Sequence, residues 1–167
     1  MNCDRNIRLA TLLDVDAIMP VISAAKQTMR RNGNMHQWAD SYPSAGAVEC
    51  DISSGGGYVI TENNEIVGYF AMLPSPEPTY DVIYNGEWLN ATLPYLVIHR
   101  IAGLPCHHGI LHDIIRFAVS QCPNIRIDTH RDNAIMQHCL QKEGFTYCGI
   151  ILLANGDERL AYQKLFS

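Results

Sequence analysis

The chain has 167 residues, of which 47% are hydrophobic and 17% charged, a balance typical of a globular domain and not of a disordered segment. The formal net charge is −5, so the chain lacks the basic surplus that binding along a nucleic-acid backbone requires. No apolar run approaches the roughly 20 residues of a membrane-spanning helix, so neither nucleic acid nor a membrane is an expected partner.

The length fits one domain over residues 1–167, with a core that needs no disulfide. The opening sequence MNCDRNIRLA carries charges at once and lacks the apolar core of a signal peptide. The six cysteines show no CxxC pattern and no regular spacing; they stand at positions 3, 50, 106, 122, 139 and 148. We therefore expect reduced thiols in a cytoplasmic protein.

The first third of the chain predicts a short strand and two helices. The strand covers residues 7–10, and an amphipathic helix follows from the capping-box sequence TLLD at Thr11 to the turn at Asn32. Pro20 lies inside this helix and is expected to kink or split it. Ser44 can cap a second helix that ends at Ile52.

The rest of the chain predicts two hairpins around a strand–helix–strand unit. The strand at residues 95–102 is apolar almost throughout, which predicts burial on both faces near the centre of the sheet. Together with the helix at 109–120 and the strand at 125–129, it forms a βαβ unit with parallel strands. The first hairpin pairs residues 58–61 with 66–73; after a proline-rich loop and the βαβ unit come a helix at 133–143 and a closing hairpin of 145–153 with 159–165. The predicted fold is a mixed, mostly antiparallel α/β sheet.

The segment between the predicted central strand and its helix holds Gly103, Pro105 and Gly109. A strand that passes through glycine into a helix leaves the amides of the first helical turn unpaired, and these amides favour an anion. We therefore expect a phosphate-bearing ligand at this loop.

Three short motifs in the second half of the chain carry a family resemblance. They are HRIA at residues 99–102, IDTH at 127–130 followed by Asn133, and KEGF at 142–145. With the order of elements, they resemble the GCN5-related N-acetyltransferases (GNAT family) over nearly the whole chain. The resemblance implies an acyl-CoA N-acyltransferase-like sheet with flanking helices and a central parallel strand pair that splays apart. It also implies transfer of an acetyl group from acetyl-CoA directly to a primary amine of a small molecule or peptide.

The resemblance also implies where the coenzyme binds. In the family, the pantetheine arm pairs with the fourth strand and the pyrophosphate lies on the amides of the next loop. The corresponding positions here are Ile101, Ala102, Gly103, His107, His108, Gly109, Ile110, Leu111, His112 and Asn133. Of the usual loop signature only Gly109 is retained, since Cys106 and Leu111 replace the customary Gln or Arg and the final Gly or Ala. Leu140 stands where the family often has a tyrosine acid.

Transfer to an amine requires a base, because an ammonium must lose its proton before the nitrogen can attack a thioester. The candidate bases are His99, His130 and Glu87, with Asp128 as a further carboxylate. An imidazole titrates near neutral pH and suits this task. A histidine on a buried strand is also commonly a hydrogen-bonded core residue, so both interpretations of His99 stay open.

Two other features have more than one interpretation. His108 and His112 are four residues apart, a spacing that can place two imidazoles on one helical face, but no third ligand follows at a motif spacing, so no metal is expected. The aromatic residues ahead of the central strand either line an acceptor pocket or pack their loop onto the sheet; they are Trp38, Tyr80, Tyr84 and Trp88.

The altered loop leaves an alternative function open. A non-catalytic protein of the same fold that binds a ligand or a partner would tolerate Cys106, Leu111 and Leu140. The apolar residues 150–153 on a predicted edge strand would also suit a homodimer.

Overall fold

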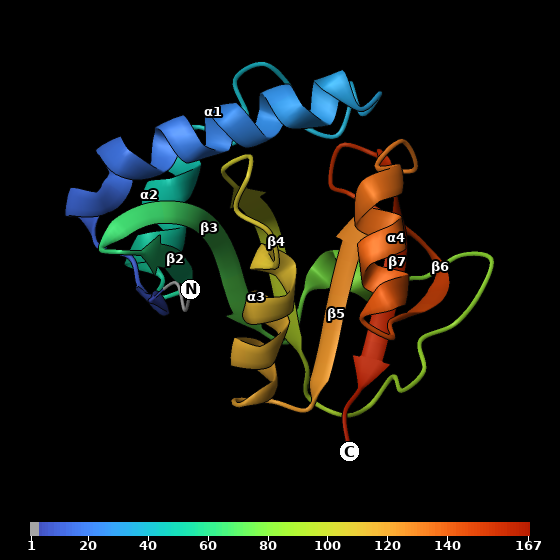
Figure 1. Cartoon of the computed structure of the whole chain (residues 1–167). Helices are drawn as coiled ribbons and strands as arrows, with labels where there is room; N and C mark the ends of the chain where they lie inside the picture. The colour runs from blue at the N-terminus through green and yellow to red at the C-terminus, as the bar shows by residue number, and fades with distance from the viewer. Residues whose placement is uncertain (1–3) are drawn as a thin grey trace.

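Seven strands form one sheet in the order β1-β2-β3-β4-β5-β7-β6 in the computed structural model, which describes residues 4–167 (Figure 1). All neighbouring strands are antiparallel except β4 and β5, which are parallel. The mixed, mostly antiparallel sheet with one central parallel pair is confirmed. The strands are β1 (Arg5–Leu9), β2 (Gly57–Glu62), β3 (Glu65–Pro74), β4 (Leu96–Gly103), β5 (Asn124–Thr129), β6 (Thr146–Leu152) and β7 (Glu158–Leu165).

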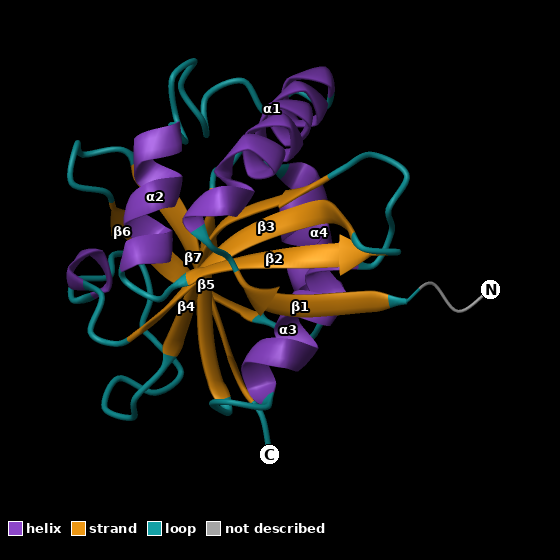
Figure 2. Ribbon diagram, turned by 90° about the vertical axis from the view of Figure 1, so that its left-hand side faces the viewer, coloured by secondary structure: helices purple, strands orange, loops and turns teal. Residues whose placement is uncertain are grey.

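Four α-helices cover the two faces of this sheet (Figure 2). They are α1 (Val15–Arg31), α2 (Ala45–Ser53), α3 (Ile110–Val119) and α4 (Ala134–Lys142), all four in the predicted places. Single 3₁₀ turns stand at Leu12–Asp14 and Pro78–Tyr80. No helix of residues 4–167 is long and apolar enough to cross a membrane.

The core has a separate layer on each face of the sheet. Because side chains alternate along a strand, Val59 and Tyr69 pack against α1 and α2, whereas the next residues, Ile60 and Phe70, pack against α3 and α4. The buried side chains of α1 and α3 recur at helical spacing, so each helix presents one apolar stripe to its layer.

The prediction that Pro20 would kink or split the first helix was wrong as far as a split is concerned. Pro20 is the sixth residue of α1, and the helix continues through it to Arg31. A proline removes the hydrogen bond from its own nitrogen to the residue four positions earlier, which here is Asp16 in the first turn. The loss therefore falls near the start of the helix.

The strand β4 lies fourth of seven, but the prediction that both of its faces would be buried was wrong. His99, Arg100 and Ile101 are only partly buried. The parallel ladder with β5 has three pairs and ends at Ile98 with Ile127, after which the two strands diverge (Figure 1). The end of β4 therefore borders a gap in the middle of the sheet.

A bulge in β4 coincides with this divergence. Along the β3–β4 ladder His99 pairs with Ala71 and Ala102 with Tyr69, so Arg100 and Ile101 together oppose one residue of β3. Arg100 has φ +52°, a left-handed conformation that is unusual away from glycine. The bulge turns the side chains that follow it relative to those before it.

Candidate active site

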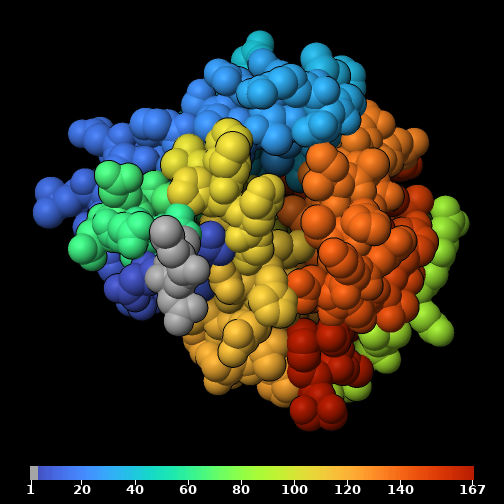
Figure 3. Space-filling view, viewed as in Figure 1, coloured from blue at the N-terminus to red at the C-terminus, as the bar shows by residue number. Residues whose placement is uncertain are grey.

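A cavity of about 440 Å³ opens where β4 and β5 diverge. Its walls come from β4, β5, the segment after α1 and the start of β7. A second cavity of about 230 Å³ adjoins it between α1, the loop after β4 and α4, where the surface is hollowed (Figure 3). Met29, Ile101, Asn133 and Met136 line both, so the two cavities are direct neighbours.

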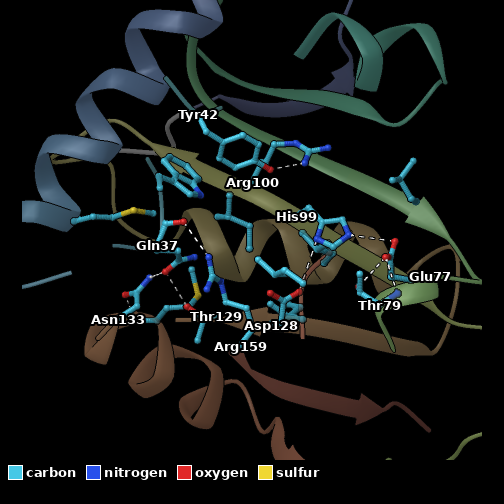
Figure 4. Close-up of a pocket in the computed structure, with 18 of the residues that line it drawn as sticks. Gln37, Tyr42, Glu77, Thr79, His99, Arg100, Asp128, Thr129, Asn133 and Arg159 are labelled. Atoms are coloured by element: carbon cyan, nitrogen blue, oxygen red, sulfur yellow. Dashed lines mark hydrogen bonds and ion pairs between the residues drawn. The ribbon is translucent and has the colours of Figure 1, made fainter. Parts of the chain in front are cut away.

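His99 lies in the wall of the first cavity between two carboxylates (Figure 4). Its Nε2 is 3.9 Å from Glu77 Oε2, and its Nδ1 is 3.9 Å from Asp128 Oδ1. These distances are too long for direct hydrogen bonds but fit ion pairs with a protonated ring. A positive charge gained by His99 would therefore be stabilised from both sides.

The two carboxylates are themselves held in place. Glu77 accepts hydrogen bonds from the Thr79 hydroxyl (2.8 Å) and amide (3.2 Å), and Asp128 accepts one from the Tyr80 hydroxyl (2.5 Å). The neighbouring His99 ring, followed by the Thr79 donors, lowers the pKa of Glu77 to about 2 against the opposing effect of burial. Glu77 is therefore ionised throughout the neutral range.

On another wall, Arg100 belongs to a buried polar network. Its Nε donates to Asp51 Oδ2 (2.8 Å), its Nη1 donates to the Tyr42 hydroxyl (2.8 Å), and Tyr69 donates to the same Asp51 oxygen (2.6 Å). Burial lowers the pKa of Arg100, but the interactions with Asp51 and Tyr42 raise it by more than burial lowers it. The net shift of this pKa is upward. Burial and the Asp51 carboxylate raise the pKa of Tyr69. This network fixes the bulged residue of β4.

Gln37 joins the segment after α1 to β5, β7 and the start of α4. Its side-chain oxygen accepts from Thr129 Oγ1 (3.3 Å) and from Asn133 Nδ2 (3.0 Å). Its main-chain oxygen accepts from Arg159 Nη2 at 3.1 Å. Arg159 is 6% exposed and lines the first cavity.

The second cavity lies beside the predicted phosphate loop. Cys106 and Gly109 have φ values of +69° and +81°, and Gly109 is the N-cap of α3. Helical hydrogen bonding begins with the Asp113 amide, which donates to Gly109 O. Within residues 4–167, no acceptor receives the amides of residues 110–112. The loop thus presents free donors at a helix N-terminus.

Arg5 braces this loop from β1. Its guanidinium donates to His108 O (2.8 Å), pairs with Asp113 (2.8 Å) and pairs with Glu62 (3.1 Å), and Glu62 also contacts the His107 ring. Arg5 therefore offsets the two acidic side chains nearest the loop, which would otherwise repel an anion.

The coenzyme positions implied by the sequence fall into two groups. Six of them line the second cavity: Ile101, Gly103, His107, Ile110, Leu111 and Asn133. Ala102 is buried, and His108, Gly109 and His112 are exposed on the loop and the first turn of α3. Asn133 caps α4 by accepting from the Met136 amide. The structure thus gathers six of these positions around one groove.

Two of the three candidate bases lie outside the first cavity. Glu87 is exposed in the loop before β4, and neither cavity has it in its lining. His130 follows β5, but its Nδ1 accepts from the Asp132 amide (3.0 Å), and burial and the nearby Arg159 lower its pKa. His130 therefore lies outside the cavity lining, and His99 is the candidate that faces the cavity.

Several other predicted features have packing roles. Leu140 is fully buried in the layer beneath α3 and α4, whereas its neighbour Cys139 lines the second cavity. Trp38 lines the first cavity, but Tyr80 and Trp88 pack in a core cluster and Tyr84 is 48% exposed. The aromatic segment therefore mainly packs the loop onto the sheet.

The two histidines considered for a metal lie on either side of the start of α3. His108 precedes α3, and His112 lies 3.0 Å from Glu143. In the part of the chain that the structure describes, no three His, Cys, Asp or Glu side chains gather as metal ligands. The five cysteines of that part form no disulfide bond.

The sequence signals missed Gln37, Glu77 and Arg159. Glu77 stands between Pro76 and Pro78, a rigid setting for a carboxylate that could have marked it. Gln37 lies in an irregular segment, and nothing in its sequence context indicates its contacts with β5 and β7.

The sheet order, the separated central pair and the helix that follows the glycine loop define an acyltransferase fold. An acetyltransferase of the GNAT family from Streptococcus agalactiae 2603 is 35% identical, with 98% of this chain and 96% of that chain covered and a TM-score of 0.88. GNAT-family acetyltransferases from Listeria monocytogenes 4b F2365 (20% identity, 99% of both chains, TM-score 0.71) and Bacillus cereus ATCC 10987 (17%, 98% of both, 0.63) share the fold. No family model and no curated protein matches the chain. The chain belongs to the GCN5-related N-acetyltransferase family, as its motifs predicted.

Proposed function

We propose that this protein transfers the acetyl group of acetyl-CoA directly to a primary amine, with His99 as the general base. The observation that carries the proposal is the position of His99, between Glu77 and Asp128, in the cavity that opens where β4 loses its parallel partner. The cavity on the other side of Ile101 supplies room for the coenzyme arm.

The residues present fit acetyl-CoA. Beyond Ile98, the edge of β4 that faces β5 is free of the parallel ladder, so an extended pantetheine arm can pair with it as a strand would. The free amides of residues 110–112 suit a pyrophosphate. Arg5 supports this binding because it neutralises Glu62 and Asp113. Leu111 narrows the groove, but its backbone amide remains available.

The side chains of the first cavity suit the proton transfers. Acetyl-CoA would supply the acetyl group as a thioester, whose thiol has a pKa near ~8.5 and is a tolerable leaving group. His99 takes one proton of the bound ammonium, and the freed amine nitrogen attacks the carbonyl carbon. The C–S bond then breaks as that nitrogen gives its second proton to water. Glu77 and Asp128 stabilise the imidazolium. Leu140 offers no acid, so the thiolate takes its proton from water.

The first test is coenzyme binding. Acetyl-CoA should raise the melting temperature, whereas an adenine-only control should not, because ligand binding to the native state stabilises it by mass action. No shift at millimolar acetyl-CoA would overturn the proposal. Thiol release should then accompany acetylation of an amine, and desulfo-CoA should bind without releasing any thiol.

The alternative is a non-catalytic protein of this fold that binds a ligand. It is supported by the buried Leu140, which provides no acid. It predicts a thermal shift with no thiol release across a broad amine panel. The homodimer and the cytoplasmic location remain predictions.

A further inference from the structure

Arg159 carries a buried charge with no carboxylate beside it. Its side chain lines the first cavity, and the residue is 6% exposed. Its Nη1 donates to Glu158 O (2.9 Å) and its Nη2 to Gln37 O (3.1 Å), both main-chain atoms. Among residues 4–167, no carboxylate oxygen lies within 4.0 Å of its guanidinium; the Glu158 side chain pairs with Arg131 instead.

This situation differs from that of Arg100, the other arginine in the wall of the cavity. Arg100 is paired with Asp51 and also contacts Tyr42. Burying a charge without a counter-ion is unfavourable, and it persists where a ligand supplies the opposite charge. A guanidinium fork matches a carboxylate particularly well. Arg159 is therefore the cavity residue suited to an anionic group.

The His99 wall has the opposite sign. Glu77 and Asp128 contact His99 and neutral donors, and within the described chain neither lies within 4.0 Å of a lysine or arginine. Figure 4 shows His99 and Arg159 in the walls of the same cavity, on different strands. A ligand that spans the cavity meets two acidic groups at one wall and a cation at the other.

We propose that the acceptor is an amino acid, a small molecule that carries a carboxylate as well as its primary amine. The carboxylate binds Arg159, and the ammonium faces His99, Glu77 and Asp128. This assignment rests on the proposed function and narrows its substrate class. It excludes as acceptors simple amines and peptide N-termini, whose carboxylate is absent or distant.

The experiment compares matched acceptors at saturating acetyl-CoA. Free α-, β- and γ-amino acids are assayed beside the amines that remain after removal of the carboxylate, beside their amides, and beside short peptides. A lost hydrogen bond to a charged group corresponds to about a 10- to 100-fold change in rate. The best amino acid should therefore have a kcat/KM about 10- to 100-fold above that of its matched amine.

An arginine variant ties this preference to Arg159. Arg159→Met should lower kcat/KM for the best amino acid, mainly by raising KM, and should shrink the gap to its matched amine about tenfold or more. Arg159→Lys keeps the charge and should retain part of the preference. Arg131→Met is the matched control, because Arg131 is exposed and lies outside the cavity lining. Melting temperatures show whether each variant is folded.

The outcomes separate the two proposals. Amines or peptides acetylated as well as every amino acid would overturn the carboxylate assignment and leave the acetyltransferase proposal standing. A preference unchanged in both Arg159 variants would also overturn it. If no amino acid is acetylated, the assignment falls, and the acetyl-CoA thermal shift decides whether the proposed function falls with it.

Discussion

Arg100 donates from Nε to Asp51 Oδ2 across 2.8 Å, which ties the bulged residue of β4 to a buried carboxylate on α2. Asp51 is 4% exposed and also accepts from the Tyr69 hydroxyl. Because Arg100 has φ +52°, this contact holds a strained backbone position at the point where β4 leaves β5. The pair thus links α2 to the geometry of the cavity.

Removing one partner of this pair should destabilise the protein strongly. Arg100→Ala leaves Asp51 buried without its counter-ion, a change that typically costs about 3–5 kcal/mol. Urea denaturation of Arg100→Ala, Asp51→Ala and the double variant measures it. The double variant should lose less than the sum of the two single losses, because the partners are coupled. Additive losses would contradict the coupling.

The His99 ring should be needed for turnover and not for coenzyme binding. His99→Ala is expected to lower kcat about 10²- to 10⁴-fold, the usual contribution of a general base, with the acetyl-CoA thermal shift kept. His138→Ala is the matched control, since His138 is exposed on α4. Glu87→Gln should leave kcat unchanged because Glu87 lies outside the cavity lining. A His99→Ala enzyme with normal kcat would exclude this base.

Gly109 should matter for the coenzyme beyond its effect on stability. Gly109→Ala forces a side chain into φ +81° and is expected to cost about 1 kcal/mol, and the altered loop should weaken the acetyl-CoA thermal shift. Gly156→Ala is a matched control, because Gly156 has φ +89° with open space around it in the β6–β7 turn. It should lose similar stability and keep the full shift. Equal shifts in the two variants would place the phosphates elsewhere.

Asp14 should stabilise the start of α1 in a pH-dependent way. Its bond with Arg8, followed by the Thr11 amide, lowers its pKa from 3.8 to about 2 against the effect of burial. A lowered pKa gives stability that is present above pH 4 and is lost as the pH falls toward 2. Asp14→Ala should cost about 1 kcal/mol at pH 7, because it removes the carboxylate that accepts from the Thr11 amide and pairs with Arg8. Denaturation curves at pH 7 and pH 3 should show the difference between variant and wild type shrinking at pH 3.

Most of the fold could be predicted from local patterns. Patterns of a few adjacent residues were enough to predict three elements. They are the alternating strands around Asn63-Asn64, the helical stripe of α3 and the Asn155-Gly156 turn. The parallel pairing of β4 and β5 could be predicted because an apolar strand stands on each side of α3 in the sequence. The bulge at Arg100 could not be predicted from the sequence. It depends on Asp51, about fifty positions earlier, and no local pattern marks such a contact.

The candidate site was predictable only on one side. The loop at Gly109 is encoded by adjacent residues, so its place at a helix N-terminus was foreseen, and His99 was named from its strand. The first cavity combines Gln37, Glu77 and Arg159, which are far apart in sequence and meet only when the sheet forms. Residues that meet only through tertiary contacts have no fixed spacing in the sequence, so they form no motif that could be recognised there.

The three-pair ladder between β4 and β5 has an evolutionary consequence. An edge that offers only N–H and C=O groups is nearly the same whichever side chains occupy positions 101–103, proline excepted. A lineage can therefore exchange those side chains over generations without removing the atoms available to an extended donor molecule. The residues of the first cavity would bind an acceptor through their side chains, so exchanging them would change the contacts that they offer. If the proposed function holds, acceptor choice is expected to diverge faster than donor choice.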